Sequence, residues 1–532
     1  MAEHNERPLG AQISHMLKDR GVDVIFGIPG VHNQEMYRGI EEAEITHVLA
    51  RHEQGAGFMA DGYARATGKP GIAYVITGPG VCNIMTPMGQ AFSDSVPLLV
   101  LSSCLDETAA RRGQLHQMND QEIAAGTVCD WSHTALSASA AYALVDRALS
   151  EFGAARPRSK HIQVPIAQLE AAAPPAPAPF PSTPHPRAAK EVVTDTARRL
   201  AEARRPLFIF GGGARGGTEA ARDLCRLLGA ASFTSYAGRG IIAPEDPLHF
   251  GSYLAKPDSA EVLARADLVV AVGTELAEVD LWRERPGHAC PMIRVDLDPE
   301  TLTDAARAEH HVRADAGPFL ADLLDALGEA DLSGTDWTAG EVRAARSKWR
   351  AATEAEYPGI PQVCDALRAA LPPETMIYSD MTQFAYCAKE VWPMDRPGHW
   401  HHPYGFGTLG YALPAAIGGA IARRGQPTLA IAGDYGFHYT LQELGVAVEL
   451  GLSLPILLWD NGKLGAIEAS MVGAQIAPNA VVARNPDFCR LAEAFGAHSA
   501  APADLKALQK AVLNAFEAEG PTLIYVTPEV VG

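Results

Sequence analysis

The sequence predicts an α/β protein of three consecutive domains, each built on a parallel sheet flanked by helices. Short apolar runs of strand length alternate with helical stretches along the chain, which is typical of parallel α/β sheets. The 532 residues are enough for about three domains at ~150 residues each. A proline-rich stretch also divides the first part of the chain from the rest.

The first predicted domain covers residues 1–170, and a linker at 171–188 follows it. Residues 171–187 contain seven prolines, so they cannot form a helix or a central strand and are expected to be extended. The apolar runs that predict strands in the first domain are Val24–Phe26, Gly71–Ile76, Leu98–Leu101 and His161–Val164.

The second domain is expected at 189–335 and the third at 361–532, with a connecting helix and linker at 336–360. The helix of this connection is predicted over 340–356 and ends before the break at Pro358–Pro361. Strands are predicted in the second domain at Leu207–Phe210, Leu268–Val272 and Ile293–Val295, and in the third at Met376–Tyr378, Thr428–Ala432, Ile456–Trp459 and Leu523–Val526.

Composition excludes several classes of protein. Hydrophobic residues make up 47% of the chain, and the net charge of −19 argues against nucleic acid as a partner. The eight cysteines include no C-x-x-C pair, so neither a disulfide framework nor a zinc site is expected. No apolar run reaches the ~18 residues of a membrane helix, and the polar N-terminus does not resemble a signal peptide. We therefore expect a cytoplasmic protein without a membrane partner.

Two acidic or amide positions at strand ends carry the clearest chemical signal. Gly433–Phe437 follows one predicted strand, Asp460–Asn461 follows the next, and His438–Leu450 between them reads as one helix. In parallel sheets, such residues meet at the carboxyl edge, where α/β folds bind ligands. A carboxylate and an amide oxygen make a partial shell for Mg²⁺, which takes its other ligands from phosphates and water. This pair predicts a metal-bridged diphosphate.

Two segments of the first domain are further candidates. Glu53 lies in RHEQGA just before a small-residue helix at Gly57–Arg65, where it would exchange a proton with a buried ligand ring. The alternative is a carboxylate stabilised by the helix dipole. The turn Thr77–Asn83 allows close backbone approach, with Asn83 as a cap of the next helix, but it also reads as a purely structural turn.

A glycine turn in the second domain leaves two interpretations open. Gly211, Gly213 and Gly216 follow a predicted strand but match the dinucleotide-binding pattern only loosely. The turn predicts either a tight strand–helix connection or a flavin or nicotinamide site of an oxidoreductase.

Taken together, these pieces resemble the thiamine-diphosphate (ThDP) enzyme superfamily over essentially the whole chain. RHEQGA with Glu53, the Gly-Pro-Gly turn, the linker, GDYGF and the Asp-Asn pair stand in the family's order, and Asn461 lies 27 residues after Asp434 (461 − 434 = 27). The resemblance implies the ThDP-binding fold, with pyrimidine-binding, central and pyrophosphate-binding domains, as in acetolactate synthases and 2-oxo acid decarboxylases. Tyr435 and Asp460 depart from the metal signature.

The resemblance also implies roles for individual residues. Glu53 would bond the aminopyrimidine ring, with Asn83 nearby, and Leu409 would be the apolar wedge that bends the cofactor. Metal ligands would be Asp434, Asn461 and the backbone oxygen of Lys463. Each site would lie between two subunits, which implies at least a homodimer and usually a homotetramer. The remaining cofactor-binding positions implied are Thr382, Gln383, Gly407, Tyr435, Gly436 and Leu464.

Three positions narrow the choice within the superfamily. Val31 stands where pyruvate decarboxylases carry an aspartate, and Gln117 matches acetolactate synthases. Ser470 replaces the tryptophan that those synthases carry nine residues after the metal asparagine. The acidic FAD-contacting segment is not recognisable around Thr274–Asp280, so FAD is not expected.

GIPGVH at 27–32, GDYGF and the tail ARNPDF at 483–488 resemble 5-guanidino-2-oxopentanoate decarboxylases most. This resemblance implies ThDP- and Mg-dependent decarboxylation of a small-molecule 2-oxo acid, 5-guanidino-2-oxopentanoate, to 4-guanidinobutanal and CO₂ in arginine catabolism. The alternatives are carboligation of pyruvate, as in acetolactate synthase, and a non-catalytic paralogue that keeps the fold.

Protonic and tail-binding residues are predicted from their chemistry. His32 and His116, beside Gln117, are the candidates to deliver a proton near the reacting carbon, since a histidine titrates near neutral pH. The alternative for either one is a structural histidine with its hydrogen bonds satisfied. A guanidinium substrate requires a carboxylate at the far end of its pocket. The four candidates for that carboxylate are Glu35, Asp120, Glu122 and Glu468, and the alternative for each is a solvated surface charge.

Overall fold

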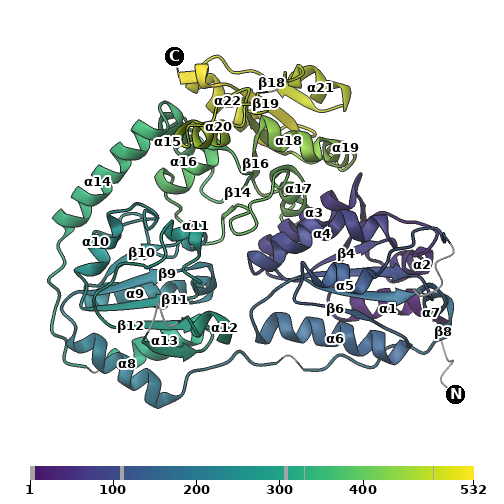
Figure 1. The fold of residues 1–532 in the computed structure, drawn as a ribbon, viewed down its shortest axis with the longest axis horizontal. Coiled ribbons are helices and arrows are strands. Elements are labelled where there is room, and N and C mark those ends of the chain that lie inside the picture. Colours follow the sequence, from purple (N-terminus) through teal and green to yellow (C-terminus); the bar gives the residue numbers. More distant parts are fainter. Residues whose placement is uncertain are drawn as a thin grey trace.

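A computed structural model describes residues 6–107, 113–181, 183–304, 309–328, 330–482 and 484–531. Figure 1 shows three bodies of strands and helices, coloured purple to blue, teal, and green to yellow. Each contains one sheet of five or six strands, and every strand pair described within these three sheets is parallel. The predicted α/β class is confirmed.

The first sheet has the strand order β3-β2-β4-β5-β7-β6. Its central strands β4 and β5 are buried along their whole length, which explains their nearly continuous apolar sequence. The strands are β2 (Val24–Gly27), β3 (Thr46–Leu49), β4 (Gly71–Val75), β5 (Leu98–Cys104), β6 (Trp131–Thr134) and β7 (Lys160–Pro165). The helices are α1 (Leu9–Asp19), α2 (Gln34–Glu42), α3 (Glu53–Thr67), α4 (Pro79–Ser93), α5 (Gln121–Gly126), α6 (Ala138–Ala154) and α7 (Ile166–Glu170).

The proline-rich stretch leaves the first body in an extended form, as expected from its composition. Its start pairs with the N-terminal strand, β8 (Ala172–Ala173) against β1 (Arg7–Pro8), in antiparallel fashion. The described residues between 174 and 187 contain no helix or strand.

The second sheet has the order β10-β9-β11-β12-β13. Its strands are β9 (Pro206–Phe210), β10 (Ala231–Thr234), β11 (Leu268–Val272), β12 (Met292–Asp296) and β13 (His310–Arg313). The helical segments are α8 (Lys190–Glu202), η1 (Gly212–Gly217), α9 (Thr218–Leu228), η2 (Tyr236–Gly238), α10 (Ser259–Ala264), α11 (Glu278–Leu281), α12 (Pro299–Leu302) and α13 (Ala316–Leu327).

A long helix, α14 (Ala339–Glu356), connects the second body to the third along the left of Figure 1. The third sheet has the order β15-β14-β16-β17-β19-β18. Its strands are β14 (Met376–Ser379), β15 (Trp400–His401), β16 (Thr428–Gly433), β17 (Pro455–Trp459), β18 (His498–Ala500) and β19 (Thr522–Val526). The helical segments are α15 (Ile360–Ala370), α16 (Gln383–Val391), α17 (Ala412–Ala422), α18 (Asp434–Thr440), η3 (Leu441–Glu443), α19 (Leu444–Glu449), α20 (Gly465–Gly473), α21 (Phe488–Ala494), α22 (Leu505–Phe516) and η4 (Pro528–Val531).

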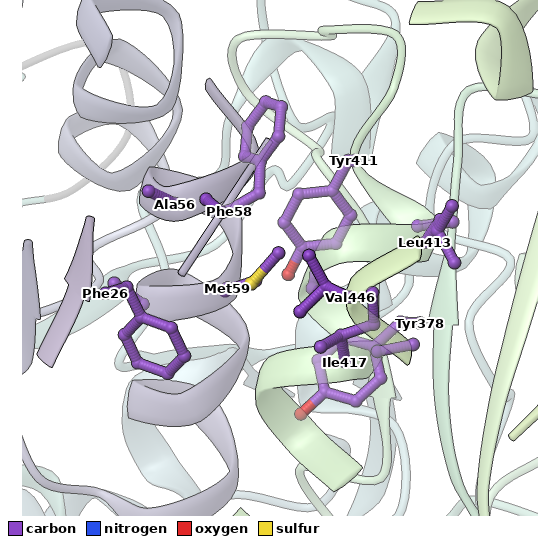
Figure 2. Close-up of a cluster of buried hydrophobic side chains, with 14 of the residues drawn as sticks. Phe26, Ala56, Phe58, Met59, Tyr378, Tyr411, Leu413, Ile417 and Val446 are labelled. Atoms are coloured by element: carbon purple, nitrogen blue, oxygen red, sulfur yellow. The ribbon is translucent and has the colours of Figure 1, made fainter. Parts of the chain in front are cut away.

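The first and third bodies share one hydrophobic core, formed where α3 packs on α17. Figure 2 shows Phe58 and Met59 of α3 facing Tyr411 and Ile417 of the third body. The helices approach closely because glycines face backbone: a Cβ at Gly418 would lie 1.9 Å from the carbonyl oxygen of Met59. No described helix has the length and apolarity needed to cross a bilayer.

The structure corrects the single helix predicted over His438–Leu450. The helix begins earlier, at Asp434, and is broken into α18, η3 and α19. Thr440 leaves helical geometry at the first junction, with φ −138° and ψ 20°. Its hydroxyl donates to the carbonyl of Gly410 at 2.8 Å, and this tertiary contact is invisible to local periodicity.

Two helix starts in the first body were also predicted wrongly. The helix expected at Gly57–Arg65 starts at Glu53, because His52 caps it by accepting from the backbone N–H of Gln54 at 3.1 Å. Asn83 does not cap α4. This helix starts at Pro79, a residue favoured at the first helical position, so Asn83 lies inside it.

Candidate active site

The carboxyl edge of the third sheet gathers most of the residues proposed to hold a metal and a diphosphate. Gly433 at the end of β16 pairs with Trp459 at the end of β17, so Asp434 and Asp460 leave the sheet side by side. Asn461 follows directly. Sequence reasoning placed these residues at one edge because parallel strands end together there.

Helix α16 brings its first residues to the same edge. Asn461 donates through Nδ2 to Oε1 of Gln383 at 3.1 Å. Thr382 is buried beside Gly433, where an added Cβ would lie 3.0 Å from the threonine hydroxyl. Both residues therefore lie at the N-terminus of α16, next to Asp434.

Asp380 was not singled out from the sequence as a site residue. Its carboxylate is fully buried, accepts from the backbone N–H of Gly410 at 3.0 Å, and has a pKa raised to about 6 by burial. A Cβ at Gly436 would lie 2.6 Å from Oδ2 of Asp380, so this position requires glycine. Asp380 thus joins the Gly407–Tyr411 loop to the start of α18.

Asn485, in the ARNPDF segment at 483–488, was not predicted from the sequence as a site residue. The side-chain amide of Asn485 donates to Oδ2 of Asp434 at 2.8 Å and to Oδ1 of Asp460 at 3.0 Å. Burial raises the pKa of Asp434, and the Asn485 bond opposes that shift. Its neighbour Ala483 lies outside the described residues.

The remaining candidates of the third body surround this edge. Leu464 is the N-cap of α20, and its backbone N–H donates to the carbonyl of Val481 at 2.8 Å. The backbone N–H of Lys463 donates to Oδ1 of Asn461 at 3.2 Å, so the two residues form one turn. Tyr435 and Leu409 are half-buried, and Gly407 has a φ of 66°, in the region that favours glycine.

In the first body, the structure pairs Glu53 with Asn83. Nδ2 of Asn83 donates to Oε2 of Glu53 at 2.8 Å. Glu53 is 8% exposed, and a Cβ at Gly80 would lie 3.4 Å from its Oε1, so glycine keeps the space beside the carboxylate open. The Gly-Pro-Gly turn therefore starts α4 and also leaves room beside the Glu53 carboxylate.

Two histidines of the first body follow the carboxyl ends of strands: His32 comes after β2 and His116 after β5. The rings of His32 and His116 are 4.8 Å apart between centroids in an edge-to-face arrangement. Nδ1 of each is buried without a hydrogen-bond partner in the described chain. Burial, and then the charge of His116, lower the pKa of His32. The side-chain oxygen of Gln117 accepts from the backbone N–H of Gln114 at 3.2 Å.

The two groups of residues form separate half-sites within one chain. No described hydrogen bond or ring contact joins Glu53, Asn83, His32 or His116 to the edge around Asp434. The donor chemistry of each fits half of thiamine diphosphate. One half offers a carboxylate and an amide to a ring with nitrogen atoms, and the other offers oxygen ligands suited to Mg²⁺ and a helix N-terminus suited to phosphate.

The four acids considered for a cationic substrate tail all have partners. Glu35 is bound by Arg38 at 2.6 and 3.0 Å, and Asp120 caps α5 by accepting from the N–H of Ile123 at 2.9 Å. Glu122 accepts from the hydroxyl of Thr134. Glu468 is paired with Lys463, which lies only five residues before it, at 2.5 Å.

The glycine turn at 211–213 has a packing explanation. A Cβ at Gly211 would lie 2.1 Å from the carbonyl oxygen of Gly273, at the end of the neighbouring strand β11. A Cβ at Gly213 would lie 3.1 Å from Cα of the same Gly273. This close approach of two chain segments accounts for the glycines and favours the strand–helix connection.

Three family models match the chain in order. They describe the thiamine pyrophosphate enzyme N-terminal TPP binding domain at residues 7–123, the central domain at 193–323, and the C-terminal TPP binding domain at 380–526. The chain is also similar to the probable 2-ketoarginine decarboxylase AruI of Pseudomonas aeruginosa, with 42% identity over 97% of this chain and 93% of the relative.

Other relatives are more distant. The large subunit of acetolactate synthase isozyme 1 of Escherichia coli is 27% identical over 98% of this chain and 94% of its own. The acetolactate synthase of Mycobacterium bovis is 30% identical over 92% of this chain and 82% of its own.

Proposed function

Because the chain belongs to the thiamine pyrophosphate enzyme family, we propose that it uses thiamine diphosphate and Mg²⁺ to decarboxylate a 2-oxo acid. The proposed substrate is 5-guanidino-2-oxopentanoate, also called 2-ketoarginine, which would give 4-guanidinobutanal and CO₂. The observation that carries this proposal is the 42% identity, over nearly the whole chain, to a relative named for that activity.

The residues of the two half-sites support this chemistry. When bound, thiamine diphosphate supplies the electron sink for loss of CO₂. Glu53 would hold a proton at a ring nitrogen of the cofactor, and Asn83 keeps the Glu53 carboxylate in place through its bond to Oε2. Asp434, Asn461 and the backbone oxygen of Lys463 would hold the metal, with Thr382 and Gln383 beside the diphosphate.

We propose that one complete site combines half-sites from two chains. Each chain supplies a ring-side group and a metal-side group without a described contact between them, which supports a homodimer as the minimum active unit and is compatible with a homotetramer. We retain the division into domains at 1–170, 189–335 and 361–532 as part of this proposal.

Among the four tail candidates, Glu468 fits a guanidinium best. Glu35 is bound by Arg38 of the same helix, and Asp120 caps α5. Glu122 accepts from the hydroxyl of Thr134 on β6. Among the described residues, the carboxylate of Glu468 is paired only with Lys463, in the segment that follows the proposed metal ligand Asn461. A substrate guanidinium would replace this lysine and bind the carboxylate through two hydrogen bonds.

His32 and His116 are the proposed proton donors on the substrate side. Their Nδ1 atoms are buried and unpartnered in the described chain, and the lowered pKa of His32 keeps that ring neutral near pH 7. After CO₂ has left, one of these imidazoles would deliver a proton to the reacting carbon.

A CO₂-release assay over a panel of 2-oxo acids tests the function. We expect the highest kcat/KM for 5-guanidino-2-oxopentanoate, with ThDP binding that needs Mg²⁺ and is lost in Asp434→Ala. Preferred turnover of pyruvate to acetolactate would instead support a synthase, which the 27–30% identical relatives represent. No turnover of any 2-oxo acid, despite tight ThDP binding, would identify a non-catalytic paralogue.

A further inference from the structure

The side chain of Asn485 connects two carboxylates at the proposed metal edge. Its Nδ2 group donates one bond to Asp434 at 2.8 Å and one to Asp460 at 3.0 Å. Asp434 is 3% exposed and Asp460 8% exposed, so both charges are shielded from water. An amide nitrogen carries two hydrogens, and this arrangement uses one for each carboxylate.

Asp460 is held from two further directions. The backbone N–H of Gly462 donates to its Oδ1 at 2.8 Å, and the hydroxyl of Tyr525 donates to its Oδ2 at 3.0 Å. Asp460 is therefore a fixed point in the sheet edge. Because Asn485 bonds both residues, it links the orientation of the Asp434 carboxylate to that of Asp460.

Asn485 belongs to a segment with little other attachment to the protein. Between α20 and α21, described residues 474–480 are all exposed, as are Val482, Arg484, Pro486 and Asp487. Its start is bonded to the end of α20, for example from the N–H of Ile476 to the carbonyl of Met471 at 2.8 Å. Among the described residues, its later part is held by a backbone bond from Leu464 to Val481, by a bridge between Lys463 and Val482, and by Asn485, whose Oδ1 also lies 3.4 Å from Nε2 of His438. Asn485 is thus the point where this exposed segment meets the carboxylates.

We propose that Asn485 is a positioning residue, which orients Asp434 for the metal and couples metal binding to docking of segment 474–487. The proposal rests on the Mg²⁺ and ThDP site described above. Donors that orient a ligand carboxylate commonly change metal affinity 10–100-fold when removed. Since binding linkage is reciprocal, a bound metal must in turn stabilise the docked segment.

Three variants test this proposal in the full-length protein. Asn485→Ala removes the amide, and Asn485→Asp keeps its shape but replaces the donor with a third carboxylate. The matched control is Asn479→Ala, in the same segment, whose amide donates to the carbonyl of Ala477 at 3.3 Å and to no other described residue. Mg²⁺ affinity is measured by titration calorimetry at fixed ThDP without substrate, and docking by the rate of tryptic cleavage after the exposed Arg484.

We expect both Asn485 variants to bind Mg²⁺ about 10–100-fold more weakly than the wild type. They should also be cleaved faster after Arg484, and Mg²⁺ with ThDP should slow cleavage in the wild type and in Asn479→Ala only. Wild-type Mg²⁺ affinity in Asn485→Ala would overturn the proposal.

Tighter Mg²⁺ binding by Asn485→Asp would also overturn it, because net charge and not the amide would then govern the site. Faster cleavage of the wild type on adding Mg²⁺ would contradict it as well, since the metal would then displace Asn485. If the wild type itself bound no Mg²⁺ with ThDP, the proposed function would fail together with this inference.

Discussion

The carboxylate of Glu443 accepts from the backbone N–H of Arg51, with distances of 3.2 and 3.1 Å to its two oxygens. Glu443 ends η3 in the third body, and Arg51 precedes α3 in the first, so the bond joins residues 392 positions apart. A Cβ at Gly55 would lie 2.3 Å from the Glu443 carboxylate. Glu443 therefore holds the N-terminal turn that carries Glu53, and it does so from the helical stretch that starts at Asp434.

The pH dependence of stability follows from the burial of Glu443. Burial raises its pKa from 4.5 to about 7, so the folded protein binds a proton that the unfolded chain has lost. The contribution of Glu443 to stability therefore falls as pH rises from about 4.5 to about 7, by up to about 3 kcal/mol. Glu443→Gln removes this pH-dependent contribution. The stability of the variant minus that of the wild type should therefore increase as pH rises from about 4.5 to about 7, which thermal melts at several pH values measure. A constant difference between the two proteins would contradict the raised pKa.

Glu53→Gln should abolish ThDP-dependent decarboxylation while leaving the fold intact. The neutral amide cannot exchange a proton with the cofactor ring, although it keeps a hydrogen bond with Asn83 available. Single-turnover CO₂ release and circular dichroism check the two parts of this statement. Turnover at the wild-type rate would rule out the proposed role of Glu53.

Glu468→Gln should affect substrates selectively. For 5-guanidino-2-oxopentanoate we expect kcat/KM to fall about 10-fold or more, because a charge-assisted hydrogen bond contributes ~1.5–3 kcal/mol. For an uncharged 2-oxo acid of similar length the change should be small. Glu35→Gln serves as the matched control, since Glu35 is already bound by Arg38. If kcat/KM fell equally for both substrates, the guanidinium of the substrate would not bind at Glu468.

Gly418→Ala tests the contact between the first and third bodies. The added Cβ would meet the carbonyl oxygen of Met59 at 1.9 Å, so the helices α3 and α17 must separate. We expect a loss of about 1–3 kcal/mol or more in the free energy of unfolding. Gly153→Ala, in α6, should be neutral or stabilising, because no described atom beyond its chain neighbours and its own helix backbone lies within 4 Å of the new Cβ. Denaturant unfolding of the two variants makes the comparison.

Much of the architecture could be predicted because its signals are local. The apolar runs at 268–272 and 428–432 correspond to β11 and β16, and the helix predicted at 340–356 corresponds to α14. Short half-exposed strands such as β3 and β6 were missed, since their alternating or polar sequences carry little hydrophobic signal. Helix starts at Glu53 and Pro79 were misplaced because a histidine cap and a proline at the first position set them.

The sequence by itself determined which chemical groups leave the ends of the strands: Asp434 after β16, and Asp460 with Asn461 after β17. The spacing of elements along a chain dictates this, because parallel strands end at one edge. Only the tertiary structure decided that Asn485 bridges two of these carboxylates and that Glu443 reaches back to Arg51. Those contacts join residues 25 to 392 positions apart, and they exist only because packed helices and sheets bring distant segments together.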